Sequence, residues 1–199
     1  MKSTVTGGGS RFIPSLFAAL VAASAATSAL AHAPSGAIFT TTFDGAEVNH
    51  NIYAAKTDVY LDGGPGPGAP QGAAGLDDGV YVFQVTDPSG KKLLSQDPAK
   101  CREFVVTAGV ITSVVVTGGC PHVTGVDLDH RAITVQLVPY ADTPNPGGEY
   151  KAWVVREDDF LAGCAALGVA NGLDVVDCGQ SPGNFHGFRK HVIEPSAVR

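Results

Sequence analysis

The sequence has little of what long helices and nucleic-acid-binding surfaces require. Its 199 residues include one Met and one Trp, and charged residues make up only 16% of the chain. The 19 Asp and Glu exceed the 13 Lys and Arg, and the resulting net charge of −6 repels phosphate backbones. The 25 Gly and 13 Pro favour short elements joined by many turns, and a chain of this length suits one domain. We therefore expect few long helices and no nucleic-acid partner.

Local signatures of catalysis and of ligand loops are also missing. No Gly-x-Ser-x-Gly elbow occurs, and no Lys-Ser or Lys-Thr pair follows the Gly-rich stretch 63–75. A glycosidase with two carboxylates far apart in sequence would leave no local spacing signal, but a small sandwich offers little room for its cleft. No loop spells the about six to eight oxygens that calcium needs. The acidic clusters are instead predicted to bond the backbone of their own turns; they are Asp77 with Asp78, Asp127 with Asp129 and His130, and Asp158 with Asp159.

The N-terminal residues 1–31 are predicted to be a secretory signal peptide. Two cations precede an Ala-rich apolar stretch that ends in small residues. A membrane anchor is the alternative, but such a helix needs about 20 strongly apolar residues, and serines and a threonine interrupt this stretch. We therefore expect a secreted or envelope protein whose mature chain has no integral membrane span.

Two cleavage positions fit the small-x-small pattern of a signal peptide. A cut after Ala31 starts the mature chain at His32, whereas a cut after Ala33 places the rigid ring of Pro34 beside the broken bond. We therefore prefer the cut after Ala31. The mature chain then keeps 11 Lys and Arg against 19 Asp and Glu, a formal charge of −8.

All four cysteines lie in the exported part, where an even number indicates disulfides. Three pairings are possible, and we prefer the two local ones, Cys101 with Cys120 and Cys164 with Cys178. Each closes a loop of about 15 to 20 residues and contributes about 3 kcal/mol on the loop-entropy model. A zinc site is the alternative, but these spacings lack the close cysteine pairs that zinc usually takes.

Apolar and polar residues alternate over short spans, which is the two-residue period of half-buried strands. Within 78–90, for example, Tyr81, Phe83 and Val85 share one face, and a Pro-Gly turn follows. A second turn at Ala108-Gly109 predicts a hairpin. The predicted strands are 37–43, 51–63, one within 78–90, 91–95, the two arms of a hairpin at 101–116, 132–138 and 148–156. These strands, with no convincing helix between them, predict an all-β antiparallel sandwich of the prealbumin-like or Ig-like type.

The chain is thereby divided into three segments. Residues 1–31 form the signal peptide, and 32–158 form the sandwich domain, in which the Gly/Pro/Ala stretch 63–75 links two strands. Residues 159–199 form a disulfide-closed excursion and a tail with room for one added strand.

Two stretches have the form Gly-x-Tyr at the entry to a strand. They are "DGVYVFQVTDPSGKKLLS" and "PGGEYKAWVV". Both resemble the closing hairpins of prealbumin-like sandwiches, and Cna B-type repeats of bacterial surface proteins have a similar entry and a similar Asp-Pro-x-Gly exit. Over about 37–188 the chain also resembles uncharacterised exported bacterial proteins of this kind, through "NIYAAKTDVYLDGGP", "VQLVPYADTPNPGGEYKAWV" and "GNFHGF". Some Cna B-type domains form a Lys-to-Asn bond beside a buried carboxylate, and Lys56 and Glu103 would take such parts here, although no matching Asn motif is present.

Trp153 is a candidate for carbohydrate binding. Strand alternation places this only Trp with Glu149 and Lys151, on the more polar face of its strand. If its ring is open to solvent, it offers a stacking platform for polysaccharide. The alternative is a largely buried packing residue.

His32 is a candidate for copper binding. As the first residue of the mature chain it would offer an amine and an imidazole, and imidazole suits Cu(II). The second ligand would be one of the remaining histidines, which are His50, His122, His130, His186 and His191. The alternative is an N-terminal stub before the first strand.

Taken together, these features favour a secreted structural or interaction β-sandwich of the bacterial envelope or extracellular matrix. Its expected partners are extracellular protein or polysaccharide, with no cofactor and no catalytic activity. A carbohydrate-binding or metal-binding module is the second hypothesis, and a small hydrolase is the third.

Overall fold

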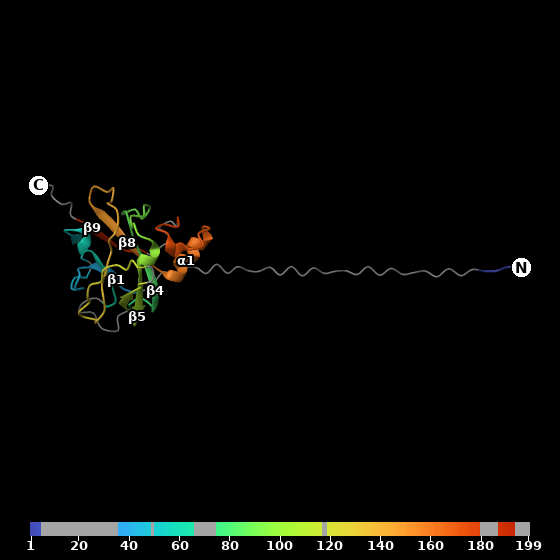
Figure 1. Cartoon of the computed structure of the whole chain (residues 1–199), viewed down its shortest axis with the longest axis horizontal. Helices are drawn as coiled ribbons and strands as arrows, with labels where there is room; N and C mark the ends of the chain where they lie inside the picture. Colours follow the sequence, from blue (N-terminus) through green and yellow to red (C-terminus); the bar gives the residue numbers. More distant parts are fainter. Residues whose placement is uncertain (5–35, 49, 66–74, 117–118, 180–186, 194–199) are drawn as a thin grey trace. The chain divides into compact units, whose positions relative to one another are not determined.

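The strands of this protein form two separate sheets, as seen in a computed structural model (Figure 1). The structure describes residues 1–4, 36–48, 50–65, 75–116, 119–179 and 187–193. Most of the predicted signal peptide lies outside these residues. Strands predominate, pairing is antiparallel in every ladder but one, and the only α-helix among the described residues is ten residues long.

The smaller sheet has three strands in the order β1-β3-β7. Its strands are β1 (Ile38–Thr41), β3 (Tyr60–Gly63) and β7 (Val135–Gln136). Ile38 pairs with Gly63 and Thr41 with Tyr60, and this register leaves Leu61 facing the core.

The larger sheet has six strands in the order β2-β9-β8-β4-β5-β6. Its strands are β2 (Ile52–Tyr53), β4 (Gly79–Thr86), β5 (Glu103–Thr107), β6 (Val110–Val114), β8 (Glu149–Arg156) and β9 (Gly187–Ile193). The long strands β4 and β8 lie in the middle of the sheet, and β2 runs parallel to β9. Three short 3-10 helices lie outside the strands: η1 (Lys56–Asp58), η2 (Ala99–Cys101) and η3 (Gly172–Asp174).

The main core lies between the two sheets. Tyr81, Phe83 and Val85 of β4 all belong to it, which confirms the face predicted from alternation. β8 contributes every second residue in the same way. The other members from the larger sheet and from the smaller sheet include Tyr150, Ala152, Val154, Phe104, Val106, Ile111, Ile38, Leu61 and Val135.

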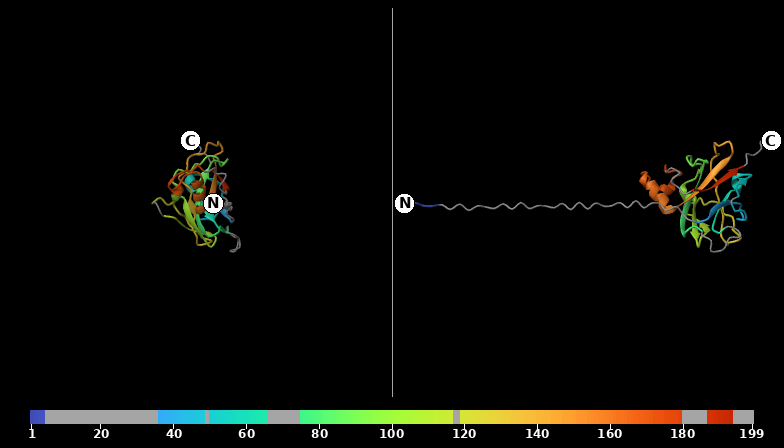
Figure 2. Two further views of the ribbon diagram at one scale, coloured as in Figure 1. Left: turned by 90° about the vertical axis from the view of Figure 1, so that its right-hand side faces the viewer. Right: turned by 180° about the vertical axis from the view of Figure 1, so that it is seen from behind.

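A second apolar cluster covers the opposite face of the larger sheet. Val82, Trp153 and Val155 point to this side, where they meet Phe160 and Cys164 of the helix α1 (Glu157–Ala166). Figures 1 and 2 show α1 on the far side of β4 and β8 from β1. Both faces of the β4–β8 pair are therefore buried, which the sequence-based expectation of one sandwich core did not include.

The predicted hairpin and the two predicted disulfides are confirmed. β5 and β6 pair across Ala108 and Gly109, whose φ angles of 52° and 85° suit a tight hairpin turn. Cys101 bonds Cys120 with Cα atoms 5.1 Å apart, and Cys164 bonds Cys178 with Cα atoms 5.4 Å apart.

Three predicted strands are shorter or broken. The segment 51–63 changes sheet, because β2 belongs to the larger sheet and β3 to the smaller one, with η1 at the crossing. Residues 91–95 make only isolated bridges. Leu94 and Ser95 both donate their backbone N–H to the same Val85 carbonyl, so no regular ladder forms here. Within 132–138 only β7 is a ladder strand, because Ile133 N bonds the Ile111 carbonyl at the edge of the other sheet.

The C-terminal segment contributes both a helix and a strand. No helix was predicted there, and α1 begins directly after β8. β9 adds to the larger sheet between β2 and β8. Among the residues that the structure describes, no helix has the length and apolar character needed to cross a membrane.

Removal of the Cys164–Cys178 disulfide is expected to loosen α1 from the larger sheet. The bond closes a loop with a sequence separation of 14 within the second apolar cluster. The double variant Cys164→Ala/Cys178→Ala should lower the free energy of unfolding by about 3 kcal/mol. Urea denaturation followed by the fluorescence of Trp153, which packs in this cluster, measures the change. An unchanged free energy of unfolding and unchanged fluorescence would contradict a closing role for this bond.

Candidate functional site

Trp153 lies in the second apolar cluster and does not offer an open ring face. Its side chain is 7% exposed, and its Nε1 donates a hydrogen bond of 2.8 Å to Thr86 Oγ1. The Lys151 ammonium lies 3.9 Å from the centre of the ring. Gly90, with φ of +72°, also covers it, since a Cβ there would meet the ring at 2.7 Å. Trp153 therefore packs the larger sheet against the other residues of the second apolar cluster.

The histidines proposed as copper ligands are not all described by the structure. His32 and His186 lie outside the described residues, and His191 is placed only as a residue of β9. The other three each pair with a carboxylate: His50 with Glu47, His122 with Asp97 and His130 with Asp127. Among the described residues no group of three or more His, Cys, Asp and Glu is arranged to hold a metal ion.

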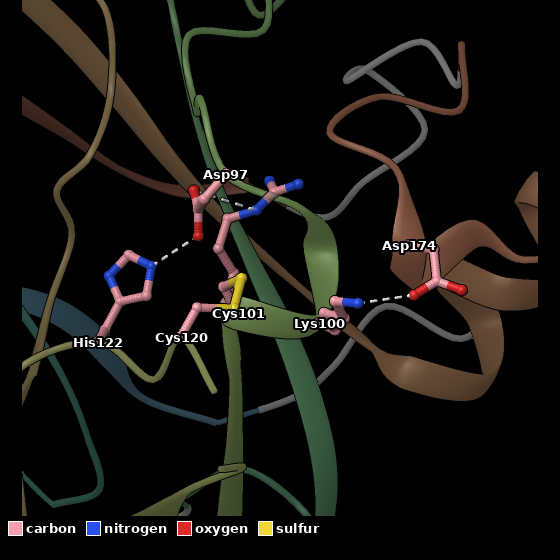
Figure 3. The surroundings of a disulfide bond; sticks show 7 residues. Asp97, Lys100, Cys101, Cys120, His122 and Asp174 are labelled. Atoms are coloured by element: carbon pink, nitrogen blue, oxygen red, sulfur yellow. Dashed lines mark hydrogen bonds and ion pairs between the residues drawn. A yellow bond between two sulfur atoms is a disulfide. The ribbon is translucent and has the colours of Figure 1, made fainter. Parts of the chain in front are cut away.

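The most buried polar cluster consists of Asp97, Arg102 and His122, which we call the Asp97 network (Figure 3). The side chains of Arg102 and His122 are 1% and 2% exposed, and that of Asp97 is 12% exposed. Asp97 Oδ2 lies 2.9 Å from His122 Nε2, and Asp97 Oδ1 lies 3.8 Å from Arg102 Nε. The carboxylate therefore has the His122 imidazole at hydrogen-bond distance and the Arg102 cation just beyond it.

His122 uses both of its ring nitrogens inside the protein. Nδ1 lies 2.6 Å from the Gln136 carbonyl, which can only accept, and Nε2 faces the Asp97 carboxylate. Both nitrogens are therefore engaged with other groups of the protein. The edge-to-face contact with Phe83, whose ring centre is 4.8 Å away, packs the imidazole against the main core. No ring nitrogen is left to accept a proton from a substrate.

Arg102 is held at the boundary between the sheet and the C-terminal segment. Its guanidinium donates to the Phe83 carbonyl at 3.3 Å and to the Val176 carbonyl at 2.7 Å. Burial lowers the pKa of Arg102 to about 10, and the charges of Asp97 and Asp177 oppose that shift. Arg102 thus remains a cation at neutral pH in spite of its burial.

The Asp97 network surrounds the Cys101–Cys120 disulfide, which joins η2 to the loop that carries His122. The same short helix also binds the C-terminal segment. Ala99 donates its N–H to the Val175 carbonyl at 3.0 Å, and Lys100 pairs with Asp174 at 2.9 Å (Figure 3). η2 therefore connects three parts of the chain that are distant in sequence.

The Asp127 cluster bonds the backbone of its own turn, as predicted from sequence, whereas Asp78 bonds a distant turn and Asp158 bonds the first turn of α1. Asp127 Oδ1 accepts the N–H of Asp129 at 3.0 Å and of His130 at 3.2 Å. Asp78 Oδ1 accepts the N–H of Ala108, and Asp158 Oδ1 accepts that of Asp159.

Lys56 and Glu103 do not come together. Lys56 donates to the Tyr140 carbonyl at 3.1 Å and pairs with Asp142, on the core side of the larger sheet. Glu103 stands opposite Val82 in register, on the other face. Burial and the charge of Glu157 raise the pKa of Glu103 to about 7. This geometry gives no support to a cross-link between Lys56 and a partner near Glu103.

Sequence reasoning missed the Asp97 network entirely. Its members are separated along the chain and form no motif, and only their proximity to two of the cysteines gave a signal. A residue next to a disulfided cysteine is held in place, as Arg102 is by Cys101 and His122 by Cys120 two residues before it.

Substitution of Asp97 is expected to destabilise the fold far more than substitution of an exposed acid. Asp97→Ala removes the partner of the buried Arg102 cation and of His122, and it should lower the free energy of unfolding by about 3 kcal/mol. The matched control is Asp174→Ala, whose partner Lys100 is one-third exposed, and its cost should stay below about 1 kcal/mol. Chemical denaturation of both variants measures the difference.

A compensating substitution separates charge burial from lost packing. Adding Arg102→Met to Asp97→Ala removes the cation that Asp97→Ala leaves uncompensated. The double variant should therefore lose less free energy of unfolding than the two single variants lose together. Strictly additive losses would show that the three side chains do not act as a network.

No protein-family model, no curated protein and no solved structure matches this chain.

Proposed function

We propose that the mature chain is an exported structural or interaction β-sandwich of the bacterial envelope or extracellular matrix. It acts through its surface and its stability and has no catalytic role. The prealbumin-like sandwich type and the export signal suggested by the sequence are part of this proposal.

One observation carries it: the buried side chains of Arg102 and His122 bond to other groups of the protein. His122 has both ring nitrogens engaged, and Arg102 donates to two carbonyls and faces a carboxylate. An acid–base catalyst needs a group within hydrogen-bond reach of a substrate proton. Groups that are buried and engaged in this way stabilise a scaffold, and this supports the non-catalytic half of the proposal.

Exposed apolar side chains support the interaction half. Phe43, Val123, Val126 and Leu128 are 51%, 57%, 40% and 74% exposed. They lie on two loops joined by the hydrogen bond from Val126 N to the Phe43 carbonyl. Apolar groups gathered at one place on a surface are typical of contact sites.

The two disulfides support export, because disulfides persist in oxidising compartments. The alternative of a binding module has less support. His32 lies outside the described residues, and the Trp153 ring is covered.

Expression of the full chain in a bacterial host tests export and location together. The mature protein should begin at His32 by mass spectrometry, leave the cytoplasm and sediment with the envelope or matrix fraction. It should release no product from a panel of chromogenic esters and glycosides. A cytoplasmic, unprocessed chain or a turnover well above background would overturn the proposal.

Paired surface variants identify the contact face. Phe43→Ser/Leu128→Ser should move the folded protein from the envelope or matrix fraction to the soluble one. The control is Leu167→Ser, which is 54% exposed beyond α1 and should leave the distribution unchanged. Equal distributions for both variants would remove Phe43 and Leu128 from the contact face.

The carbohydrate alternative predicts a loss of glycan binding on substitution of Trp153. We expect instead that Trp153→Phe changes stability, because Thr86 Oγ1 loses its buried donor at a cost of about 1 kcal/mol. Thermal unfolding and a pull-down on insoluble glycans, each carried out with the wild type and with Trp153→Phe, decide between these outcomes. Glycan binding that falls with unchanged stability would favour a carbohydrate-binding module.

A further inference from the structure

The outer face of the smaller sheet is buried although no third sheet covers it. In β1 and β3, Ile38 and Leu61 face the main core, so their neighbours Phe39 and Asp62 face the other way. Phe39 and Asp62 pair in register and are only 3% and 1% exposed. A carboxyl group is thus enclosed beside an aromatic ring.

Two segments cover this face: the turn 42–46 and the loop 123–132, which we call the cover. The Phe43 carbonyl accepts the N–H of Val126 at 2.9 Å and the hydroxyl of Thr134 at 3.0 Å. Gly125 approaches so closely that a Cβ there would lie 2.0 Å from the Phe43 carbonyl oxygen. The two segments therefore lie directly against each other at Phe43.

Asp62 and Asp127 both lie close to Gly45 of the cover. A Cβ on Gly45 would lie 3.1 Å from Asp62 Oδ2 and 3.1 Å from Asp127 Cα, so Gly45 sits between the two residues. Asp127 Oδ2 lies 2.7 Å from His130 Nδ1, and Asp127 Oδ1 accepts two backbone N–H groups. Asp62 Oδ1 accepts only the N–H of its neighbour Gly63, at 2.8 Å.

Asp62 has no compensating cation within the described part of the chain. The charged side chains carried by the cover and its flanks are Asp44, Glu47, Asp127, Asp129, His130 and Arg131. Asp44 bonds Thr42 and the turn backbone, Glu47 pairs with His50, and His130 pairs with Asp127. Two neighbouring buried carboxylates cannot both ionise without strong repulsion.

We propose that the cover is a pH-sensitive closure over the outer face of the smaller sheet, held shut by a proton on Asp62. Loss of that proton places a second negative charge beside Asp127 and drives the turn 42–46 away from the loop 123–132. Phe43, Val126 and Leu128 belong to these segments. Opening of the cover therefore also changes the positions of the exposed apolar side chains.

The sign of the effect follows from the proton balance. Burial, together with the charge of Asp127, raises the pKa of Asp62 from 3.8 to about 7. Between these two values the folded chain holds a proton that the unfolded chain has lost, so stability falls as the pH rises through this window. The loss is complete once the pH exceeds about 7, where both states are ionised.

Hydrogen exchange of the full chain tests the closure locally. The Val126 amide joins the two segments of the cover by donating to the Phe43 carbonyl, and the Gly45 amide holds the turn 42–46 by donating to the Thr42 carbonyl. Their protection factors, corrected for the intrinsic pH dependence of exchange, should fall at least about fivefold between about pH 5 and about pH 8. In Asp62→Asn the protection factors should stay the same at both pH values.

Two controls separate this effect from others. Asp129→Asn removes the same charge from an exposed position of the loop and should keep the wild-type pH response. Glu103 also has a pKa raised to about 7, so Glu103→Gln should reduce the pH dependence of global unfolding and leave that of Gly45 and Val126 intact.

A direct titration covers the case in which Asp62→Asn fails to fold. The ¹³C shift of the Asp62 carboxyl in the wild-type chain should titrate near neutral pH, together with the Val126 amide shift. A carboxyl midpoint in the ordinary range of Asp, or protection factors equally pH-dependent in Asp62→Asn and the wild type, would overturn the proposal.

Discussion

The burial of both faces of the β4–β8 pair is the constraint on which the rest of the structure depends. Each strand presents apolar residues at even and odd positions alike, for example Phe83 and Val82 on β4 and Val154 and Val155 on β8. A sheet of this kind needs a cover on each side. The smaller sheet covers one side, and α1 with η3 covers the other. The C-terminal segment is thus part of the fold. The Cys164–Cys178 bond joins α1 to the residues that follow η3.

The Asp97 network explains how the C-terminal segment is held on the larger sheet. Arg102 donates to the Phe83 carbonyl of the sheet and to the Val176 carbonyl of the C-terminal segment. An arginine can reach both because its guanidinium carries several donors in a rigid plane. Its buried charge needs a counter-charge, which Asp97 supplies, and His122 completes the arrangement from the other side of the Cys101–Cys120 bond. Charge burial, disulfide and helix packing therefore support one another at η2.

The sequence predicted those features that depend on near neighbours. The β5–β6 hairpin follows from Ala108-Gly109, the disulfides from loop length, and the turn bonds of Asp127 from its side-chain chemistry. α1 was missed because only Phe160 and Cys164 of its ten residues are buried, which leaves no apolar stripe to recognise. The change of sheet within 51–63 was missed because alternation is the same in either sheet. The Asp97 network depends on contacts between distant residues, and no local pattern encodes these.

Two buried carboxyl groups have opposite roles because their surroundings differ in charge. Asp97 lies between the guanidinium of Arg102 and the imidazole of His122, so a buried cation faces its carboxylate. Asp62 lies beside another carboxylate and one backbone N–H, so its neutral form is the one that fits. Desolvation and the charge of Asp127 favour the neutral form of Asp62. The proposed pH-sensitive element therefore lies on the smaller sheet, next to the exposed apolar side chains of the cover.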